Sequence, residues 1–244
     1  MIFSLEVNDF VGVIPARYHS TRFPGKVLEL IDGVPMVARV YKQAKASKLR
    51  RVYVATDHSA VFEAMENLDI PVIMTDEACR SGTERVAEVG SFKEGKIFIN
   101  IQGDEPYIEP EIINLVIDQF DDDQGIDMAT VASTNLSEDD WDDPDVVKVE
   151  IAGDGTAAAF FRKPSSQSDK HSCAKHLGIY GFKKDFLLRF AQMERTENEF
   201  ALDLEQMRAL DNGIPISVAI TNLDSVGINR PKDIDRLKES VILA

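Results

Sequence analysis

The chain has 244 residues, of which 44% are hydrophobic and 28% are charged, so it is long and apolar enough to bury a large core. Its 42 acidic and 27 basic side chains give a formal net charge of −15, which disfavours nucleic acid and anionic lipid as partners. The sequence lacks the ~18-residue apolar run of a spanning helix, and its N-terminal segment is not typical of a signal peptide. The two cysteines, Cys79 and Cys173, are too few for a disulfide framework. We therefore expect a cytoplasmic protein without membrane insertion.

Short apolar runs alternate with amphipathic segments of helix length through the first half of the chain. Strands are predicted at Phe10–Ile14, Arg51–Ala55, Val72–Met74, Lys96–Ile101 and Asp127–Ala132. Helices are predicted between them, at Met36–Ser47, Ser59–Leu68, Thr83–Ser91 and Pro110–Phe120. This alternation indicates βαβ units and a mostly parallel sheet that is covered on both faces.

The pattern changes to mixed α and β elements after about residue 145. Asp154-Gly155 predicts a hairpin turn between two strands. Strands are predicted at Val146–Ile151, Ala157–Phe161, His176–Phe182 and Ile216–Ile220. Helices are predicted at Lys184–Met193, Glu199–Leu210 and Pro231–Val241. The acidic run at 137–145 is interpreted as a solvated loop or helix surface.

The first predicted strand leads into a loop that is rich in cations. Prolines and a glycine within residues 14–26 forbid a helix there. Arg17, Arg22 and Lys26 place three positive side chains close together in an acidic protein, and Ser20 adds a neutral donor. Open α/β sheets bind ligands at such strand-to-helix turns. The loop therefore predicts a polyphosphate site, with a basic solvated loop as the alternative.

A second candidate site follows the strand predicted at Lys96–Ile101. Asp104 and Glu105 come directly after it, again at the carboxyl edge of the sheet. A carboxylate that faces a triphosphate loop is well placed to hold Mg²⁺. The alternative for either acid is that it caps the next helix.

Six segments together resemble the 3-deoxy-manno-octulosonate cytidylyltransferases. They are PARYHSTRFPGKVL (15–28), VATDH (54–58), SGTER (81–85), NIQGDEP (100–106), HLGIYGF (176–182) and LEQMRAL (204–210). The resemblance implies a single domain over 1–244, with a three-layer Rossmann-like α/β nucleotidyltransferase fold, a mostly parallel central sheet and a small α+β dimerisation lobe. Residues 1–135 are then the nucleotide-binding half, and 136–244 the sugar-binding and dimerisation half. The resemblance also implies CTP as donor, an octulosonate sugar acid as acceptor, Mg²⁺ as cofactor, a homodimer, and a cytoplasmic role in lipopolysaccharide biosynthesis.

The family's motifs also imply roles for individual residues of this chain. The catalytic residues are Arg22, Lys26 and Asp104. The nucleotide-binding residues are Arg17, Ser20, Arg22, Lys26, Ser81, Gly82, Thr83 and Arg85. The sugar-binding residues are Gln102, Arg162, His176, Tyr180, Glu205 and Gln206, and the metal ligands are Asp104 and Asn229.

Several of these residues have a reason or an alternative of their own. The missing side chain of Gly82 lets backbone groups approach a base edge closely. The period-2 spacing of His176, Gly178 and Tyr180 predicts that they share one strand face, where packing at the edge of the core is the alternative. For Glu205 and Gln206, the alternative is a solvated helix face.

Three departures from the family pattern bear on the substrate. Asn229 replaces a metal-binding aspartate, which leaves the number of metal ions open. The segment from Arg162 to Lys170 is shorter and more polar than in the family, and Leu202 replaces a glutamate. These last two changes suggest the 8-amino analogue of the sugar acid, with Glu199, Asp203 or Asp169 as partner of its ammonium group. A cytidylyltransferase for another sugar acid and a non-catalytic nucleotide-binding regulator are the remaining alternatives.

Overall fold

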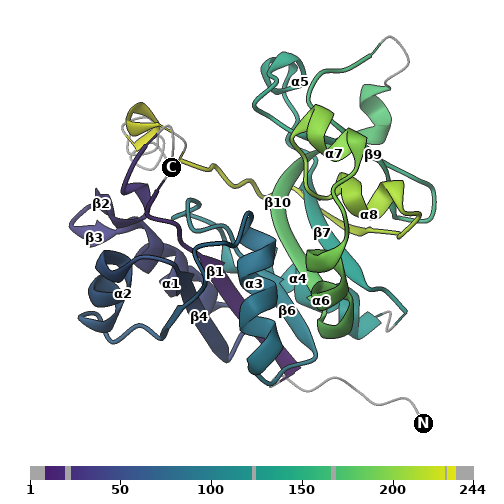
Figure 1. The fold of residues 1–244 in the computed structure, drawn as a ribbon. Coiled ribbons are helices and arrows are strands. Elements are labelled where there is room, and N and C mark those ends of the chain that lie inside the picture. The colour runs from purple at the N-terminus through teal and green to yellow at the C-terminus, as the bar shows by residue number, and fades with distance from the viewer. Residues whose placement is uncertain (1–8, 20–22, 123–124, 166–168, 229, 235–244) are drawn as a thin grey trace.

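The computed structural model describes residues 9–19, 23–122, 125–165, 169–228 and 230–234 (Figure 1). In this part of the chain, nine strands form one sheet whose main path has the order β11-β7-β10-β6-β1-β4-β5. The strands of this path are β1 (Phe10–Pro15), β4 (Arg51–Thr56), β5 (Val72–Met74), β6 (Ile97–Asn100), β7 (Met128–Ser133), β10 (Cys173–Lys183) and β11 (Ser217–Thr221). All adjacent pairs on the path are parallel except the two that β10 makes with β6 and β7. The predicted mostly parallel sheet is confirmed.

Helices cover both faces of the sheet because the strands are apolar on both sides. On β1, Phe10 and Ile14 pack into one core layer, and Val11 and Val13 pack into the other. The first layer includes α1 (Met36–Ala46), α2 (Ser59–Glu66) and α4 (Pro110–Asp122). The second includes α3 (Gly82–Phe92), α6 (Lys184–Gln192) and α8 (Met207–Asp211). The result is a three-layer α/β arrangement, and no helix in the described ranges combines the length and apolarity needed to cross a bilayer.

The second half of the chain builds a lobe beside one end of the sheet (upper right in Figure 1). The predicted hairpin is present, formed by β8 (Lys148–Ile151) and β9 (Ala157–Phe161), and β8 also pairs with the start of β10. This added pairing explains why β10 begins at Cys173, three residues before the predicted strand. The lobe also holds α5 (Glu138–Asp142), η3 (Lys170–Ser172) and α7 (Glu197–Leu202).

The single helix predicted at Glu199–Leu210 is wrong. The chain instead forms α7 and α8, and Asp203 between them has a left-handed conformation with φ of 52°. The guanidinium of Arg162 donates to the carbonyl oxygens of Leu202 (2.8 Å) and Asp203 (3.1 Å). These carbonyls are therefore bound by a side chain from another part of the lobe at the point where the helix ends.

Two further elements lie near the cation-rich loop. A short hairpin, β2 (Leu30–Ile31) and β3 (Val34–Pro35), turns at Asp32-Gly33, an unused hairpin signal in the sequence. The chain after β11 runs back over the sheet toward this hairpin, where Ile228 and Ile234 pack against Ile31 (Figure 1). Residues 231–234 of the helix predicted at Pro231–Val241 are helical, and the rest lies outside the described residues.

Candidate functional site

The cation-rich loop leaves β1 at Pro15, at the carboxyl edge of the parallel strands. The N–H of Gly25 donates to the carbonyl of Tyr18 (2.9 Å), and Gly25 has a φ of 71°, so the loop closes on itself before the short helix η2 (Lys26–Leu28). The ring of Tyr18 stacks on His58 with centroids 4.1 Å apart. The described ends of the loop, at Tyr18 and Gly25, are therefore held in place, and the predicted residues Ser20 and Arg22 lie outside the described residues.

Lys26 joins three distant segments of the chain. Its ammonium donates to a carboxylate oxygen of Asp104 (2.6 Å) and to the carbonyl oxygen of Ile228 (2.8 Å). The carbonyl of Asp104 in turn accepts from the N–H of Ile228 (2.9 Å). The structure thus brings together the two predicted catalytic residues that it describes.

The same contacts test whether the residues fit a divalent metal. Two hard oxygen atoms, from Asp104 and Ile228, converge on one positive charge, and oxygen atoms are the ligands that Mg²⁺ prefers. Among the described residues no group of three or more His, Cys, Asp or Glu side chains could hold a metal. This set fits an ion that takes most of its ligands from phosphate and water, as Mg²⁺ usually does. The second predicted ligand, Asn229, lies outside the described residues.

The N-terminus of α3 carries the predicted nucleotide segment. Ser81 caps the helix by accepting from the N–H of Glu84 (3.1 Å). A side chain on Gly82 would meet Pro15 at 3.2 Å, so the absence of a side chain lets α3 approach the end of β1 closely. Asn100, the last residue of β6, donates to the hydroxyl of Thr83 (3.1 Å). The segment is therefore held against the ends of two central strands.

Arg17 and Arg85 turn toward protein partners. Arg17 donates to the carbonyl of Cys79, just before α3. The side chain of Arg85 is fully buried, and its guanidinium donates to Asp57 (2.6 Å) and to the hydroxyl of Thr75. In this arrangement Arg85 ties α3 to the ends of β4 and β5 and has no surface open to a ligand, so its predicted contact with the nucleotide stays a prediction.

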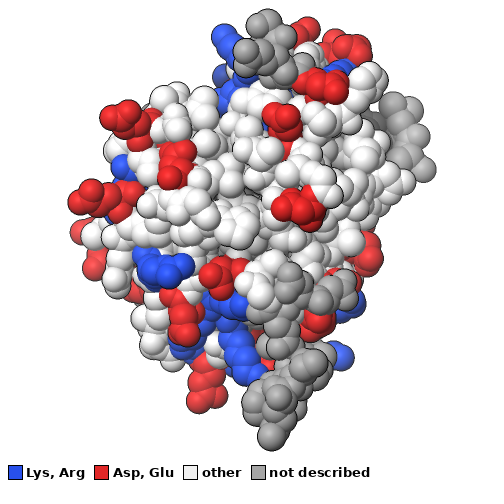
Figure 2. All heavy atoms as spheres, turned by 90° about the vertical axis from the view of Figure 1, so that its right-hand side faces the viewer, with Lys and Arg blue, Asp and Glu red and all other residues white. Residues whose placement is uncertain are grey.

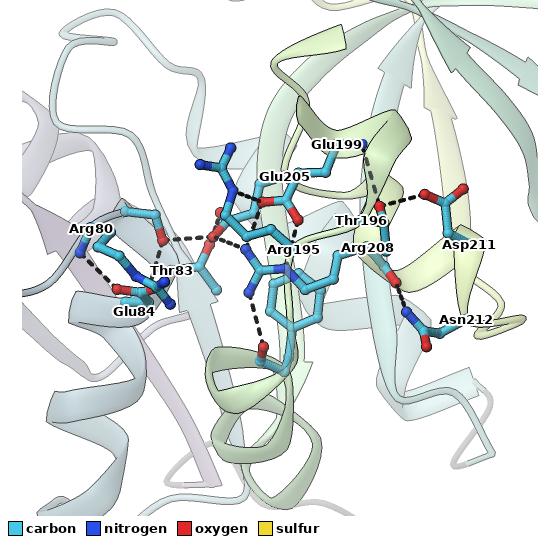
Figure 3. A network of polar contacts seen from close by, with 12 residues as sticks. Arg80, Thr83, Glu84, Arg195, Thr196, Glu199, Glu205, Arg208, Asp211 and Asn212 are labelled. Carbon is cyan, nitrogen blue, oxygen red and sulfur yellow. Dashed lines mark hydrogen bonds and ion pairs between the residues drawn. The ribbon is translucent and has the colours of Figure 1, made fainter. Parts of the chain in front are cut away.

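Glu205 connects the predicted nucleotide segment with the predicted sugar segment (Figure 3). Its carboxylate accepts from the hydroxyls of Ser81 and Thr83, each at 2.6 Å. Burial raises the pKa of Glu205, although these hydrogen bonds oppose the shift. The neighbouring Gln206 is buried, with its amide nitrogen unpaired. A solvated helix face, the alternative for this pair of residues, is therefore excluded.

Behind Glu205 lies a buried ion pair (Figure 3). Arg208 donates to both carboxylate oxygens of Glu199, at 2.6 and 2.8 Å, and both side chains are 2% exposed. Arg195 adds a further bond to Glu199 (2.9 Å). This pair anchors α7 to α8, and the segment between the two helices carries Glu205.

His176 and Tyr180 flank a break in the strand β10. Gly178 has a φ of 68°, and the register of β10 against β7 shifts between the two residues. Their rings nevertheless lie side by side, with centroids 5.3 Å apart. The amide of Gln102 donates to the carbonyl of Gly178 (3.2 Å), which links this break to the segment that carries Asp104.

Burial shifts the pKa values of both ring side chains toward their neutral forms. It lowers the pKa of His176 to about 3 and raises that of Tyr180 well above its usual value. The hydroxyl of Thr130 donates to the carbonyl of Ile179 (2.7 Å) and lies 3.0 Å from Nε2 of His176. Because the single hydroxyl proton is engaged, Thr130 can only accept from this nitrogen, which fixes a neutral imidazole protonated on Nε2.

A cleft of about 1290 Å³ opens beside β10 and the segment that carries Gln102 and Asp104. Its walls include four predicted site residues: Gln102, Asp104, Arg162 and His176. Its acidic lining residues outnumber the basic ones, Arg162, Lys175, Arg230 and Lys232. The acids are Asp104, Glu105, Asp140, Asp143, Asp145, Asp203 and Asp233.

Sequence reasoning missed two groups at this site. The acidic run at 137–145 is largely exposed, as predicted, but it also supplies Asp140, Asp143 and Asp145 to the wall of the cleft. Asp57, the partner of Arg85, lies within the motif VATDH but had received no role. The many acids in this run could have predicted an acidic surface, but the fold decides that this surface lies beside the cleft.

A mostly parallel sheet with a cation-bearing loop and an aspartate at its carboxyl edge provides the phosphate site and the metal-binding carboxylate that a nucleotidyltransferase needs. Residues 11–220 match the cytidylyltransferase family. The chain is 39% identical to the 3-deoxy-manno-octulosonate cytidylyltransferase of Trichlorobacter lovleyi, with 94% of this chain and 97% of the relative covered. It is 42% identical to that of Geobacter metallireducens, with 94% and 96% covered. The chain belongs to the family of 3-deoxy-manno-octulosonate cytidylyltransferases.

A solved structure agrees with this assignment. A CMP:2-keto-3-deoxy-manno-octonic acid synthetase complexed with CTP superposes with a TM-score of 0.89 at 33% identity. The match covers 96% of this chain and 98% of that one. The similarity therefore includes the lobe of the second half as well as the central sheet.

Proposed function

We propose that this protein transfers CMP from CTP to the anomeric hydroxyl of a 3-deoxy-octulosonate sugar acid and releases pyrophosphate, a step of lipopolysaccharide biosynthesis in the cytoplasm. The observation that carries the proposal is the convergence of Lys26 and Asp104 beside a cleft lined by Gln102, Arg162 and His176. Phosphate-binding and sugar-binding groups thus share one edge of the sheet. The family membership and the similar structure, a synthetase complexed with CTP, support the same reaction.

The proposed reaction is an in-line displacement at the α-phosphorus of CTP. Such a transfer needs positioning and charge neutralisation and needs no covalent nucleophile. Lys26 and Arg22 neutralise the leaving pyrophosphate, and the segment Ser81 to Thr83 holds the cytidine. Asp104 and Asn229 would hold Mg²⁺. When bound, this ion neutralises phosphate charge and lowers the pKa of the attacking hydroxyl.

We further propose that the preferred acceptor is the 8-amino analogue of the sugar acid. Its ammonium group needs an anion where the ordinary sugar presents a hydroxyl. Of the three acids suggested by the sequence, Glu199 is committed to Arg208, and Asp169 caps the short helix η3. Asp203 lines the cleft, as do Asp140, Asp143 and Asp145 of α5 and the loop after it. Asp203 is therefore the best-supported partner of the ammonium group.

A pyrophosphate-release assay with CTP, Mg²⁺ and each sugar acid tests both levels of the proposal. We expect release with both sugars and a kcat/KM at least ~10-fold higher for the 8-amino sugar, equivalent to about 1.4 kcal/mol. Equal or better efficiency with the ordinary sugar would refute the preference and leave the cytidylyltransferase activity standing. No release with either sugar would favour a different acceptor or a non-catalytic regulator.

We also propose that the protein forms a homodimer through the lobe of the second half. The side of the molecule that carries the lobe shows a broad area without charged side chains, although the formal net charge of the chain is −15 (Figure 2). Phe200 on α7 is 61% exposed. Light scattering coupled to gel filtration tests this proposal, and a monomeric mass at micromolar concentration would contradict it.

A further inference from the structure

The ammonium of Lys26 is enclosed by the oxygen atoms that fit a metal. It lies 2.6 Å from Oδ2 of Asp104 and 2.8 Å from the carbonyl oxygen of Ile228, and the Lys26 side chain is only 11% exposed. Both acceptors are hard oxygen ligands. In the protein without nucleotide, the lysine thus supplies the positive charge that Asp104 needs.

A divalent ion and this ammonium compete for the same carboxylate oxygen. A metal bound to Asp104 would place two like charges within a few ångströms of each other in a partly buried site. Binding of the ion therefore requires the ammonium to leave Asp104 or the carboxylate to turn away from it. An ammonium that leaves also loses the Ile228 carbonyl, so a new anion must take up its charge.

We propose that Lys26 is a built-in counter-cation that keeps Asp104 from binding a divalent metal until a polyphosphate arrives. The inference rests on the proposed function, because the triphosphate is the anion to which Lys26 then moves. It goes further in assigning an order: the free protein binds the metal weakly, and metal and nucleotide bind cooperatively. Lys26 acts here as a positioning residue for the metal, in addition to its role toward the leaving group.

Removal of the ammonium should therefore strengthen metal binding to the free protein. We propose to titrate the full-length protein with Mn²⁺, without nucleotide or sugar, and to follow free Mn²⁺ by electron paramagnetic resonance. Lys26→Met should bind Mn²⁺ at least ~10-fold more tightly than the wild type. Lys26→Gln provides a second neutral variant that can still donate a hydrogen bond to Asp104, and it should shift in the same direction. Thermal melting of each variant checks that it is folded.

Three control variants and one titration with CTP separate this mechanism from a simple change in net charge. Lys26→Arg keeps a cation beside Asp104 and should bind Mn²⁺ as weakly as the wild type. Lys48→Met removes a lysine that pairs with Asp118 at 2.5 Å on the exposed surface, so it makes the same charge change elsewhere and should leave Mn²⁺ affinity unchanged. Adding Asp104→Asn to Lys26→Met should abolish the gain. With CTP present, Lys26→Met should lose its advantage over the wild type.

The Mn²⁺ titration tests the counter-cation role of Lys26, and the pyrophosphate assay tests the proposed reaction, so either can fail without the other. If Lys26→Met and Lys26→Gln bind Mn²⁺ no more tightly than the wild type, the counter-cation role is overturned, even if the wild type releases pyrophosphate. The same conclusion follows if Lys48→Met gains as much as Lys26→Met. If the two neutral variants gain affinity selectively, the role is supported, and the pyrophosphate assay judges the reaction separately.

Discussion

Glu205 accepts a 2.6 Å hydrogen bond from the hydroxyl of Ser81, which lies 124 positions earlier in the chain. The same carboxylate accepts from Thr83, so one acid of the second half holds the N-terminus of α3 (Figure 3). In the proposed reaction the nucleotide binds the hydroxyls of Ser81 and Thr83, and the sugar binds the carboxylate of Glu205. Because these groups are hydrogen-bonded to each other, we expect that binding of either substrate affects binding of the other.

Glu205→Gln should impair both substrates while the fold persists. The amide keeps one acceptor oxygen but loses the charge and the symmetric pair of bonds, so we expect kcat/KM to fall ~10- to 100-fold, with KM raised for CTP and for the sugar. Steady-state kinetics measure this effect. Asp211→Asn, which alters an exposed acceptor of Thr196 and Asn198 in the same region, is the control with nearly normal kinetics. An unchanged KM for both substrates would contradict the link.

Replacement of Glu199 by Gln should destabilise the protein more than any exposed substitution. It leaves the buried guanidinium of Arg208 without its bidentate partner and with only Glu205, at 3.8 Å, as a nearby acid, and breaking such a buried pair costs about 3–5 kcal/mol. Urea denaturation measures the free energy of unfolding. The double variant Glu199→Leu/Arg208→Leu should lose less than Glu199→Gln, because no unpaired charge remains buried. A loss below about 1 kcal/mol for Glu199→Gln would show that the pair is not effectively desolvated.

The strands of the sheet could be predicted to within a few residues because they are apolar on both faces and separated by helices of ordinary length. The break between α7 and α8 could not be predicted in this way. The segment Ala201 to Gln206 has helix-forming residues, and the break coincides with contacts made by Arg162, about forty positions away. Local propensity carries no information on such a partner.

For the site as well, features within one short segment could be predicted from the sequence, and contacts between distant segments could not. The cation-rich loop and the carboxylate after β6 could be predicted from the sequence because each belongs to one continuous motif. The pairing of Lys26 with Asp104 and Ile228 spans 78 and 202 positions and depends on the return of the chain after β11. The roles of Ser20, Arg22 and Asn229 stay predictions from the sequence.

Asp104→Asn should abolish Mg²⁺-dependent turnover with little change in Tm. Asn keeps an oxygen that can accept from the partly buried ammonium of Lys26, and the Asp104 side chain is 30% exposed, so the substitution costs only about 1 kcal/mol of stability. Loss of a charge that holds the metal should reduce kcat by at least ~100-fold. Asp118→Asn, which breaks a surface pair with Lys48, is the matched control. Full activity of Asp104→Asn would remove Asp104 from the site.

His176 should make stability depend on pH below neutrality. Burial lowers its pKa to about 3, whereas an unfolded histidine titrates near 6.5, so the unfolded chain binds the extra proton between these values. The contribution of His176 is therefore fully present above pH 6.5 and is lost as the pH falls toward 3. Its maximal slope is about 1.4 kcal/mol per pH unit. Urea denaturation at pH 7.5 and 5 should show a smaller drop for His176→Gln than for the wild type, and an unchanged drop for His171→Gln, which alters an exposed histidine.

Asp203→Asn should lower the preference for the 8-amino sugar. Asn tolerates the left-handed conformation that Asp203 adopts, so the backbone and the bond from Arg162 to its carbonyl persist while the charge is lost. An ammonium left without its anion in the cleft should reduce kcat/KM for the 8-amino sugar ~10-fold or more, and the ordinary sugar, which is neutral at this position, should be affected less than ~3-fold. Asp169→Asn, which changes an acid outside the cleft lining, should leave both values unaltered. Equal losses for the two sugars would mean that Asp203 maintains the shape of the cleft but does not bind the amino group. The acids at 140, 143 and 145 would then be the next to substitute.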